Sequence, residues 1–515
     1  MTEKIYIFDT TLRDGEQSAG VAFTPEEKLE IAKQLEKMGV DTIEAGFPCS
    51  TPGDLEAVTR ISQEVRGASI AALARAVESD VDIAWESVKA AEEPRIHVFI
   101  NSSDIQMANQ LNKDREQVLT QAEAMVKRAA GYTSNVEFSP MDATRSDPAF
   151  IYTIVERCIA AGATTINIPD SVGYAIPEEL AELFKDIQEN VPNIHKARLS
   201  FHGQNDLGLC SANTLTAIQN GARQVEVTIN GIGERAGNTS MEEIVMAINT
   251  RADFFEDFHT DIDTKEIYRA SQMVERFSGM PVQWNKAVVG RNAFRHGSGI
   301  HQDGILKMRE TWEIMDPLEI GIPQGTQLVL GKLSGRHAFR EHMIELGYDL
   351  NDDELMRAFN AFKELADKKV DVDDRDLEAI ISDHRGEIDA TDIWKLDMVQ
   401  VTCGDHSTPT ATVRLISPKG EVVSDAATGT GPVDAVYRSI NRISGFSPDL
   451  TEFRVDAVTE GIDAQGSVTI RIEDASDQTY SGRGSDTDII VASAKAYVAA
   501  LNRMNLVRAR QRAMG

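Results

Sequence analysis

The chain has 515 residues, of which 42% are hydrophobic and 26% are charged, a composition typical of globular proteins with large cores. This length predicts two to four domains. The formal net charge of −30 argues against nucleic acid or an anionic membrane as a partner, because both bind basic surfaces.

The cysteines and the hydropathy pattern indicate a compartment. Cys49, Cys158, Cys210 and Cys403 are scattered and form no CxxC pair, which predicts free thiols in a reducing cytosol. The N-terminus lacks the charged and apolar regions of a signal peptide. No apolar run approaches the length of a membrane span. The sequence therefore predicts a cytoplasmic protein that binds neither membrane nor nucleic acid.

The first 250 residues alternate between short apolar runs and amphipathic helical stretches. Strands are expected at 5–8, 42–44, 70–73, 96–100, 136–138, 165–168, 198–201 and 224–228. Helices are expected between them, for example at 25–38, 54–64, 114–129 and 177–189. Eight strand–helix units in this length predict an α/β fold of the (β/α)8 TIM barrel type. A doubly wound sheet is the weaker alternative, because no phosphate-binding glycine loop follows the first strand.

Polar and titratable residues stand at or just after seven of the eight expected strands. In chain order they are Arg13, Asp14, Glu44, His97, Glu137, Ser139, Asn167, Ser171, His202 and Asn238. The carboxyl ends of barrel strands meet on one rim, so this concentration predicts an active site there. Arg13 is a fixed cation that can polarise a carbonyl or hold a carboxylate. Asp14, His202 and Asn238 offer a carboxylate, an imidazole and an amide oxygen, which suit Mn²⁺, Mg²⁺ or Zn²⁺.

The segment 230–238, with the sequence NGIGERAGN, follows the last expected strand of the barrel. Its glycines do not fit the GxGxxG pattern, which argues against a dinucleotide-binding loop. We interpret it as a turn whose backbone approaches ligand and metal closely.

The texture of the sequence changes twice after the barrel. We expect a catalytic barrel at 1–272, a mostly helical linker that contributes to the active site at 273–390, and an α+β domain at 391–515. The last domain contains an internal repeat of the βββα type: hairpins at 412–426 and 468–481, each followed by a glycine-rich turn and a helix. Neither unit would bury its apolar face alone. Without a convergent acid–base set, this domain is predicted to be regulatory, with a plain dimerisation module as the alternative.

Several motifs of the chain resemble the α-isopropylmalate synthase family. They include FDTTLRDGEQ at the first strand, VEFSP-x-DATRSDP, ATTINIPDSVGY and GARQVEVTINGIGERAGN in the barrel, and SGIHQDG in the linker. The resemblance runs nearly end to end. It implies a Claisen-type transferase that condenses acetyl-CoA with 2-oxoisovalerate, giving 2-isopropylmalate and CoA in the first committed step of leucine biosynthesis.

The resemblance also implies roles for individual residues. The metal, most often Mn²⁺, would be held by Asp14, His202 and the residue at 204, with Asn238 supporting through water, and K⁺ is a further candidate as activator. Arg13 would hold the keto oxygen and Ser171 the substrate carboxylate. The acyl pocket would be lined by four residues of the types expected for a branched keto acid: His97, Ser139, Asn167 and Pro169. His301 of SGIHQDG would act through water as the base, often from the partner subunit of a dimer.

The chain departs from the family pattern at four positions. Gln204 replaces the second histidine of HxH, Met141 replaces a glutamate, Gln106 a histidine and Trp312 a tyrosine. Methionine accepts no proton and tryptophan has no hydroxyl, so these changes bear on proton transfer and metal affinity. Glu137 is our candidate for the missing carboxylate, with Asp142 and Glu44 as alternatives.

The resemblance extends to regulation and assembly. It implies leucine as a feedback inhibitor bound near Gly429, Gly431, Gly461, Asp463, Gly482 and Gly484. It also implies a homodimer, with a tetramer as a further option. Two other functions remain open: a related acyltransferase making citramalate, homocitrate or another alkylmalate, and a catalytically weakened paralogue that binds leucine.

Overall fold

The computed structural model describes residues 2–323, 325–346, 348, 350–367, 372, 376–377, 380–381, 393–404, 407–457, 466–474 and 479–514. The chain forms two compact units, Met1–Val329 and Leu330–Gly515. The domain boundaries after 272 and 390 stay predictions, and the first falls inside helix α10 (Ile267–Ser278). None of the described helices has the length and apolar character needed to cross a bilayer.

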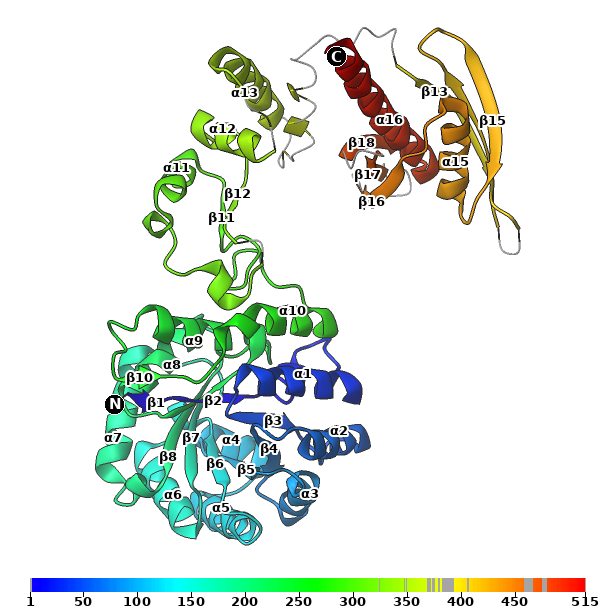
Figure 1. Ribbon diagram of the computed structural model, residues 1–515. Coiled ribbons are helices and arrows are strands. Elements are labelled where there is room, and N and C mark those ends of the chain that lie inside the picture. Colours follow the sequence, from blue (N-terminus) through cyan, green and yellow to red (C-terminus); the bar gives the residue numbers. More distant parts are fainter. Residues whose placement is uncertain are drawn as a thin grey trace. The chain divides into compact units, whose positions relative to one another are not determined.

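The first unit is built on a closed barrel of parallel strands (Figure 1). Around the barrel these are β2 (Tyr6–Asp9), β3 (Thr42–Gly46), β4 (Ser69–Arg75), β5 (Pro94–Asn101), β6 (Val136–Met141), β7 (Thr165–Asp170), β8 (Arg198–Gly203) and β9 (Gln224–Val227). The ring closes where β2 pairs with β9. The (β/α)8 prediction is confirmed, and the doubly wound alternative is wrong. Each strand overlaps its predicted range, and most run further toward the rim.

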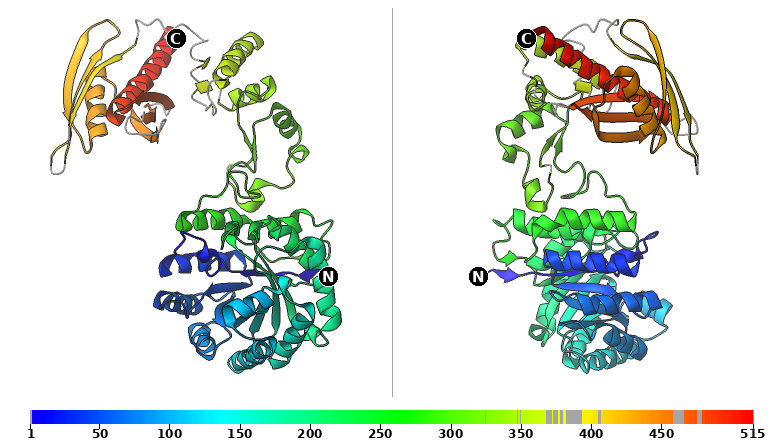
Figure 2. Two further views of the ribbon diagram at one scale, coloured as in Figure 1. Left: turned by 180° about the vertical axis from the view of Figure 1, so that it is seen from behind. Right: turned by 45° about the vertical axis from the view of Figure 1, so that its right-hand side comes forward.

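Helices surround the strands, as the views in Figure 2 also show. They are α1 (Pro25–Met38), α2 (Pro52–Glu64), α3 (Glu78–Val88), the short α4 (Asp104–Gln106), α5 (Arg115–Ala130), α6 (Pro148–Ala161), α7 (Pro177–Asn190), α8 (Cys210–Gln219) and α9 (Met241–Thr250). Helix α1 begins where its sequence predicts, because Thr24 and Glu27 form a reciprocal capping box and Pro25 occupies the first turn. Its apolar face, including Ile31 and Leu35, is buried in the core between helices and strands.

Short elements complete the first unit. Strand β1 (Glu3–Lys4) pairs with β10 (Phe258–His259), and helix α10 follows. Strand β11 (Arg295–His296) pairs with β12 (Gln327–Leu328), and helix α11 (Gly299–Lys307) lies between them in the chain. His301 therefore stands in the first turn of a helix. The two glycines flanking the helix start do not prevent local helix formation here.

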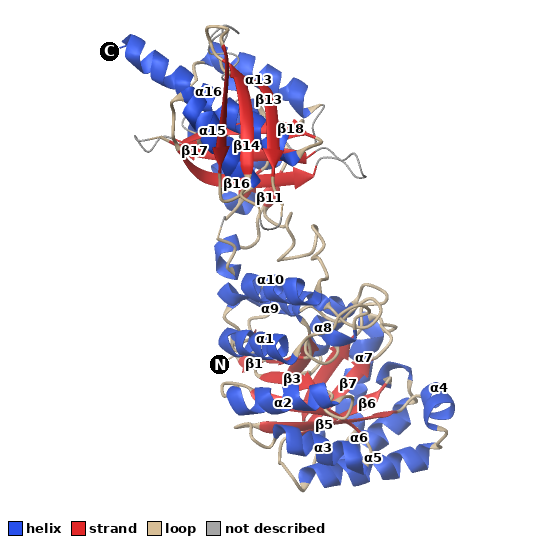
Figure 3. Cartoon of the chain, turned by 90° about the vertical axis from the view of Figure 1, so that its right-hand side faces the viewer, coloured by secondary structure: helices blue, strands red, loops and turns tan. Residues whose placement is uncertain are grey.

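The second unit contains helices and two separate sheets. Its elements are α12 (Arg336–Glu345), α13 (Asp352–Ala366), the sheet β13 (Lys395–Thr402), β14 (Thr410–Ile416) and β15 (Val422–Thr428), helix α15 (Pro432–Ser444), the sheet β16 (Asp449–Ala457), β17 (Gly466–Glu473) and β18 (Thr479–Asp486), and helix α16 (Ile489–Met514). Figure 3 shows the strands of the two sheets together with their helices. This order confirms the βββα repeat.

The two repeats share one apolar core and make matching contacts. Arg442 of α15 donates to the carbonyl of Ala426 at 3.2 Å, and Arg503 of α16 donates to the carbonyl of Ser481 at 2.9 Å. The rings of Tyr437 and Tyr497 stack with centroids 4.1 Å apart. Each repeat therefore supplies one wall of the core, which explains why neither would be stable alone.

One expected turn of this unit is instead a strand. Gly482 and Gly484 lie in β18, where a Cβ on either glycine would collide with the backbone of α16. The glycines let the helix approach the strand closely, so the local turn signal had a packing cause. Gly429 and Gly431 do lie in a connection, between β15 and α15.

Candidate active site

A cavity of about 220 Å³ opens at the carboxyl ends of the barrel strands. Its lining residues are Arg13, Asp14, Gln17, Leu73, His97, Phe99, Ser139, Met141, Asn167, Pro169, Ser171, His202, Gln204, Glu226, Glu234 and Arg235. We call this cavity the rim pocket. Nine of the sequence-predicted site residues are among them. The chain thus brings together the predicted ligands at 14, 202 and 204 and every residue predicted to contact the keto acid.

Arg13 lies at the edge of the rim pocket between three carboxylates. Its Nε donates to Glu44 Oε2 at 2.6 Å, and its terminal nitrogens lie 3.1 Å from Asp14 Oδ2 and 3.9 Å from Glu226 Oε2. Burial lowers the pKa of the guanidinium, but the attraction of these carboxylates outweighs burial and raises it. Arg13 is therefore a permanent, fixed cation that faces the pocket.

Four predicted metal ligands meet around one side-chain amide. Gln204 Nε2 lies 3.2 Å from Asp14 Oδ2, 3.3 Å from His202 Nε2 and 3.1 Å from Asn238 Oδ1. Gln204 Oε1 is buried and has no hydrogen-bond partner. Because the two ends of a glutamine amide are assigned rather than observed, rotation of the amide turns this orphaned oxygen toward the other three donors.

This donor set fits a divalent cation. It combines one carboxylate oxygen, one imidazole nitrogen and amide oxygens, which are the ligand types of Mn²⁺, Mg²⁺ and Zn²⁺ sites. His202 Nδ1 lies 2.8 Å from Glu226 Oε2, which orients the ring and leaves Nε2 for a metal. Burial lowers the pKa of His202, while its hydrogen bond to Glu226 raises it, and the net shift is upward.

A second cluster is linked to the first through Glu226, whose carboxylate is hydrogen-bonded to His202. In the described part of the chain, the only three His, Cys, Asp or Glu side chains with ligand atoms all within 4.8 Å of one another are His97, Glu137 and Glu226. Glu137 accepts from Arg95 at 2.9 Å and from Gln224 at 2.8 Å, and both of its oxygens are thereby used. Together the two sets indicate a divalent-metal site at this end of the barrel. The set of Asp14, His202, Gln204 and Asn238 is favoured, because the oxygen of Gln204 has no hydrogen-bond partner.

His97 is hydrogen-bonded through both ring nitrogens, to Glu44 on one side and Ser139 on the other. Its Nδ1 lies 2.7 Å from Glu44 Oε1, and its Nε2 lies 2.7 Å from Ser139 Oγ. Asn167 donates to the same serine at 2.9 Å. Burial lowers the pKa of His97 and Glu44 raises it, with a net upward shift, while the pKa of Glu44 is lowered because Arg13 and His97 outweigh its burial. Three of the four predicted acyl-pocket residues, His97, Ser139 and Asn167, therefore form one hydrogen-bonded chain.

Two predicted catalytic residues are not brought to the rim pocket. Glu137 is fully buried beneath it, in the ion pair with Arg95, and does not line it. His301 stacks on Trp312, with ring centroids 3.7 Å apart, and does not line it either. Of the other departures from the family pattern, Met141 lines the pocket, whereas Gln106 lies outside it and accepts from Asn101 at 2.8 Å.

Sequence reasoning missed Glu226, which touches both His202 and the Arg13 side chain. The signal was present, because β9 alternates the polar Gln224 and Glu226 with the apolar Val225 and Val227, and residues two apart point to the same face of a strand. Of the predicted regulatory residues, Gly461 and Asp463 lie outside the described part of the chain. The other four are placed as given above.

Family models match three consecutive segments of the chain. Residues 4–274 match the HMGL-like model, 288–370 the homocitrate synthase post-HMGL domain-like model, and 371–505 the LeuA allosteric (dimerisation) domain. A curated 2-isopropylmalate synthase from Carboxydothermus hydrogenoformans is 55% identical over 502 residues, covering 98% of both chains. The 2-isopropylmalate synthase from Syntrophus aciditrophicus is 54% identical over 506 residues, covering 98% of this chain and 97% of its own.

Proposed function

This chain belongs to the 2-isopropylmalate synthase family, and we propose that its rim pocket is where acetyl-CoA and 2-oxoisovalerate condense. The protein is an acetyl-CoA-condensing transferase of leucine biosynthesis. The carbon–carbon bond forms between the acetyl methyl carbon, after loss of a proton, and the ketone carbon. Hydrolysis of the thioester then releases CoA and 2-isopropylmalate. The observation that carries the site is the convergence of Arg13, Asp14, His202 and Gln204 on one cavity.

The keto acid is bound by groups that the fold holds rigidly. The Arg13 guanidinium faces the position of the ketone oxygen, where it stabilises the negative charge that develops as the carbon–carbon bond forms. Ser171 supports the substrate carboxylate, and its Oγ is oriented by the N–H of Asp142 at 2.9 Å. His97, Ser139, Asn167 and Pro169 surround the branched side chain. One methylene changes binding by only about 1–3 kcal/mol, so competition among keto acids is the sensitive measurement of specificity.

Asp14, His202, Gln204 and Asn238 would hold the divalent metal. A bound cation supplies Lewis-acid polarisation of the ketone, in addition to the charge of Arg13. The orphaned oxygen of Gln204 supports the view that glutamine serves here in place of a second histidine. We propose Mn²⁺ as the native ion, with Mg²⁺ or Zn²⁺ as alternatives and K⁺ as an activator.

We propose His301 as the base, provided by the second subunit of a homodimer. The absence of His301 from the lining of the rim pocket within one chain supports a role across subunits. Glu137 is fully buried in an ion pair with Arg95 and does not line the rim pocket. Mixing Arg13→Ala and His301→Ala subunits tests the idea. Statistical exchange in a dimer should restore about a quarter of wild-type activity if the histidine acts across subunits, and none if it acts within one.

The C-terminal repeat is proposed to bind leucine and to regulate the enzyme. The match to the LeuA allosteric (dimerisation) domain supports a dimer, and Gly429 and Gly431 remain candidates for the effector site. Assembly into a tetramer and a cytosolic location, which the four free cysteines support, belong to the same proposal.

CoA release from acetyl-CoA and 2-oxoisovalerate tests the function directly. We expect release that requires Mn²⁺ or Mg²⁺, prefers 2-oxoisovalerate over pyruvate and 2-oxoglutarate, and falls when leucine is added. Release that is fastest with pyruvate or 2-oxoglutarate would reassign the substrate. Folded protein that releases no CoA with any keto acid would overturn the proposed chemistry.

A further inference from the structure

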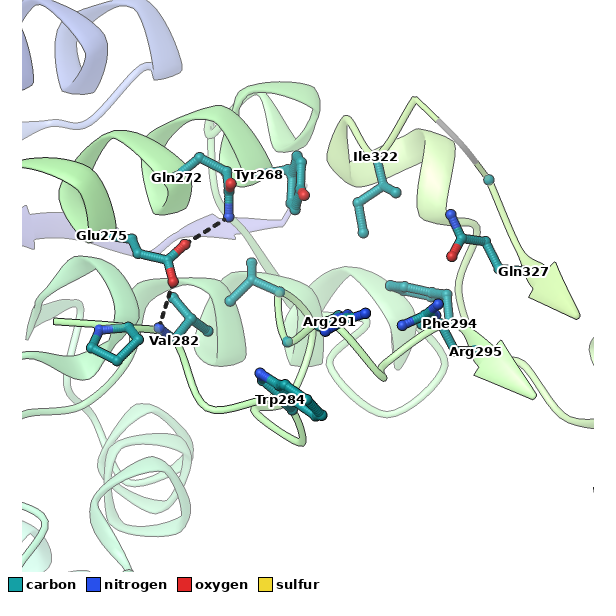
Figure 4. A pocket seen from close by; sticks show the side chains of 14 residues that line it. Tyr268, Gln272, Glu275, Val282, Trp284, Arg291, Phe294, Arg295, Ile322 and Gln327 are labelled. Carbon is teal, nitrogen blue, oxygen red and sulfur yellow. Dashed lines mark hydrogen bonds between the residues drawn. The ribbon is translucent and has the colours of Figure 1, made fainter. Parts of the chain in front are cut away.

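The segment 281–290, which leaves helix α10 at the end of the barrel, is fastened to the barrel at several points. At its start, Glu275 of α10 accepts the N–H of Val282 at 2.8 Å and the side chain of Gln272 at 3.1 Å (Figure 4). At its end, Val288 and Val289 are buried in the barrel core. Between these anchors, Lys286 reaches back toward helix α9.

Lys286 is held by three oxygen-bearing side chains. Its Nζ donates to Ser240 Oγ at 2.6 Å, is hydrogen-bonded to the carboxylate of Glu243, and lies 3.3 Å from Glu242 Oε1. The side chain is 15% exposed, and that of Glu242 is only 2% exposed. Two of these contacts are hydrogen bonds, and the third is an ion pair with the buried carboxylate of Glu242.

These partners stand at both ends of the loop 230–238. Ser240 comes two residues after Asn238, at the start of α9. Glu242 accepts the N–H of Asn230, at the other end of the loop, at 3.2 Å. Lys286 therefore reaches one end of the loop through Ser240, just beyond Asn238, and the other end through Glu242.

The loop needs external support because its backbone is strained. Asn230 and Arg235 have positive φ angles of 61° and 55°, which are uncommon for residues other than glycine. Gly231 packs so tightly that a Cβ there would lie 2.5 Å from Ser240 Oγ. Such conformations persist only where the surroundings over-determine them. This loop conformation places Asn238 Oδ1 3.1 Å from the Gln204 amide nitrogen.

We propose that Lys286 is a positioning residue that clamps both ends of the loop 230–238 and so aims Asn238 at the donor set of the rim pocket. The inference rests on the metal site of the proposed function. It links the segment after the barrel to the rim through one ammonium group. It also explains why a lysine stands here, because a neutral glutamine or serine would offer fewer donors and no charge to pair with Glu242 and Glu243.

The test is the affinity of purified protein for Mn²⁺, followed by the loss of the free Mn²⁺ signal in electron paramagnetic resonance. Partners that orient metal ligands typically change affinity by about 10–100-fold, and we expect Lys286→Met to weaken binding by that factor. The Mn²⁺ concentration that half-activates CoA release should rise in parallel. Lys37→Met is the control, because it breaks a lysine–glutamate pair of 2.6 Å, with Glu266, that involves no residue of the loop or of the Lys286 cluster, and it should bind Mn²⁺ as wild type does.

A second variant separates positioning from stability, because Lys286→Met alone leaves the buried Glu242 charge unpaired. The double variant Lys286→Met/Glu242→Gln removes that charge, so it should unfold at the wild-type temperature yet still bind Mn²⁺ weakly. Recovery of wild-type affinity in the double variant, or no loss in the single one, would overturn the role of Lys286. Failure of the wild-type protein itself to bind Mn²⁺ would instead overturn the metal site on which the inference depends.

Discussion

The barrel rim and the core of the C-terminal unit bury different kinds of side chain. Around the rim pocket, Glu44, His97 and Glu226 are nearly inaccessible, the Arg13 side chain is 11% exposed, and the four are joined by ion pairs and hydrogen bonds. The C-terminal core is built from alanine, valine, leucine and isoleucine with two stacked tyrosines. Burying charge is costly and rarely improves stability, so the charges at the rim are best explained by chemistry. The C-terminal unit instead gains stability from close packing.

The largest expected effect is at the rim. Arg13→Ala removes the cation that three carboxylates face, and we expect kcat for CoA release to fall about 10²–10³-fold. Arg13→Lys keeps a charge but loses the planar fork, so it should recover only part of the rate. Steady-state CoA release measures both variants. Full turnover by Arg13→Ala would show that the buried charges at the rim have no catalytic purpose.

The second effect is the pH dependence of stability that comes from Asp9, a buried carboxyl that, unlike Glu44, is paired with no arginine among the described residues. Burial raises the pKa of Asp9 in β2 to about 7. Its unfolded value is near 3.9, so the native state holds the extra proton between these values. The contribution of Asp9 to the free energy of unfolding is therefore fully present below about pH 4. It is lost as the pH rises to about 7, by at most about 4 kcal/mol.

Asp9→Asn should flatten this dependence, as measured by urea midpoints from pH 5 to pH 8. Asp253→Asn is the control, because the pKa of this exposed carboxyl is lowered by its hydrogen bond from Arg251 and its titration ends below that range. The same slope in wild type and Asp9→Asn would show that Asp9 is already ionised at pH 5.

In the C-terminal unit, the expected effect comes from packing. A Cβ on Gly482 would lie 2.6 Å from Ala500 N and closer still to Ala496 O. Gly482→Ala should therefore destabilise the full-length chain by about 1–3 kcal/mol, read as a lower urea midpoint of the C-terminal unit. Gly431→Ala is the matched control, since nothing lies within 4 Å of its Cβ position. Equal midpoints for the two variants would contradict the close approach of β18 and α16.

The smallest effect concerns a part-buried hydrogen bond between the two repeats. Tyr497 Oη donates to Asn441 Oδ1 at 2.8 Å. Tyr497→Phe keeps the ring stack and should cost about 1 kcal/mol of unfolding free energy. Tyr497→Leu also removes the stack and should cost more. A larger loss from Phe than from Leu would mean that this core depends on polar contacts as the rim does.

Much of the barrel could be predicted because its signals are local. Alternating apolar runs specify strands, and the capping box of Thr24 and Glu27 places the start of α1. The convergence of Arg13, Asp14 and His202 followed from one topological rule, that barrel strands end on one rim. The βββα repeat was visible because the same order of turn and helix occurs twice. The boundaries between domains, by contrast, have no such local signal.

The sequence alone determined the barrel, the repeat and the residues at the strand ends, since each depends on short-range periodicity or on chain order. Tertiary structure decided which of these residues meet. It buried Glu137 under Arg95, turned Glu226 toward His202, made a strand of the segment around Gly482, and brought Lys286 back to Ser240. These contacts join residues distant in the chain. They exist only after the barrel closes and its helices pack, because packing then decides which polar groups must satisfy one another.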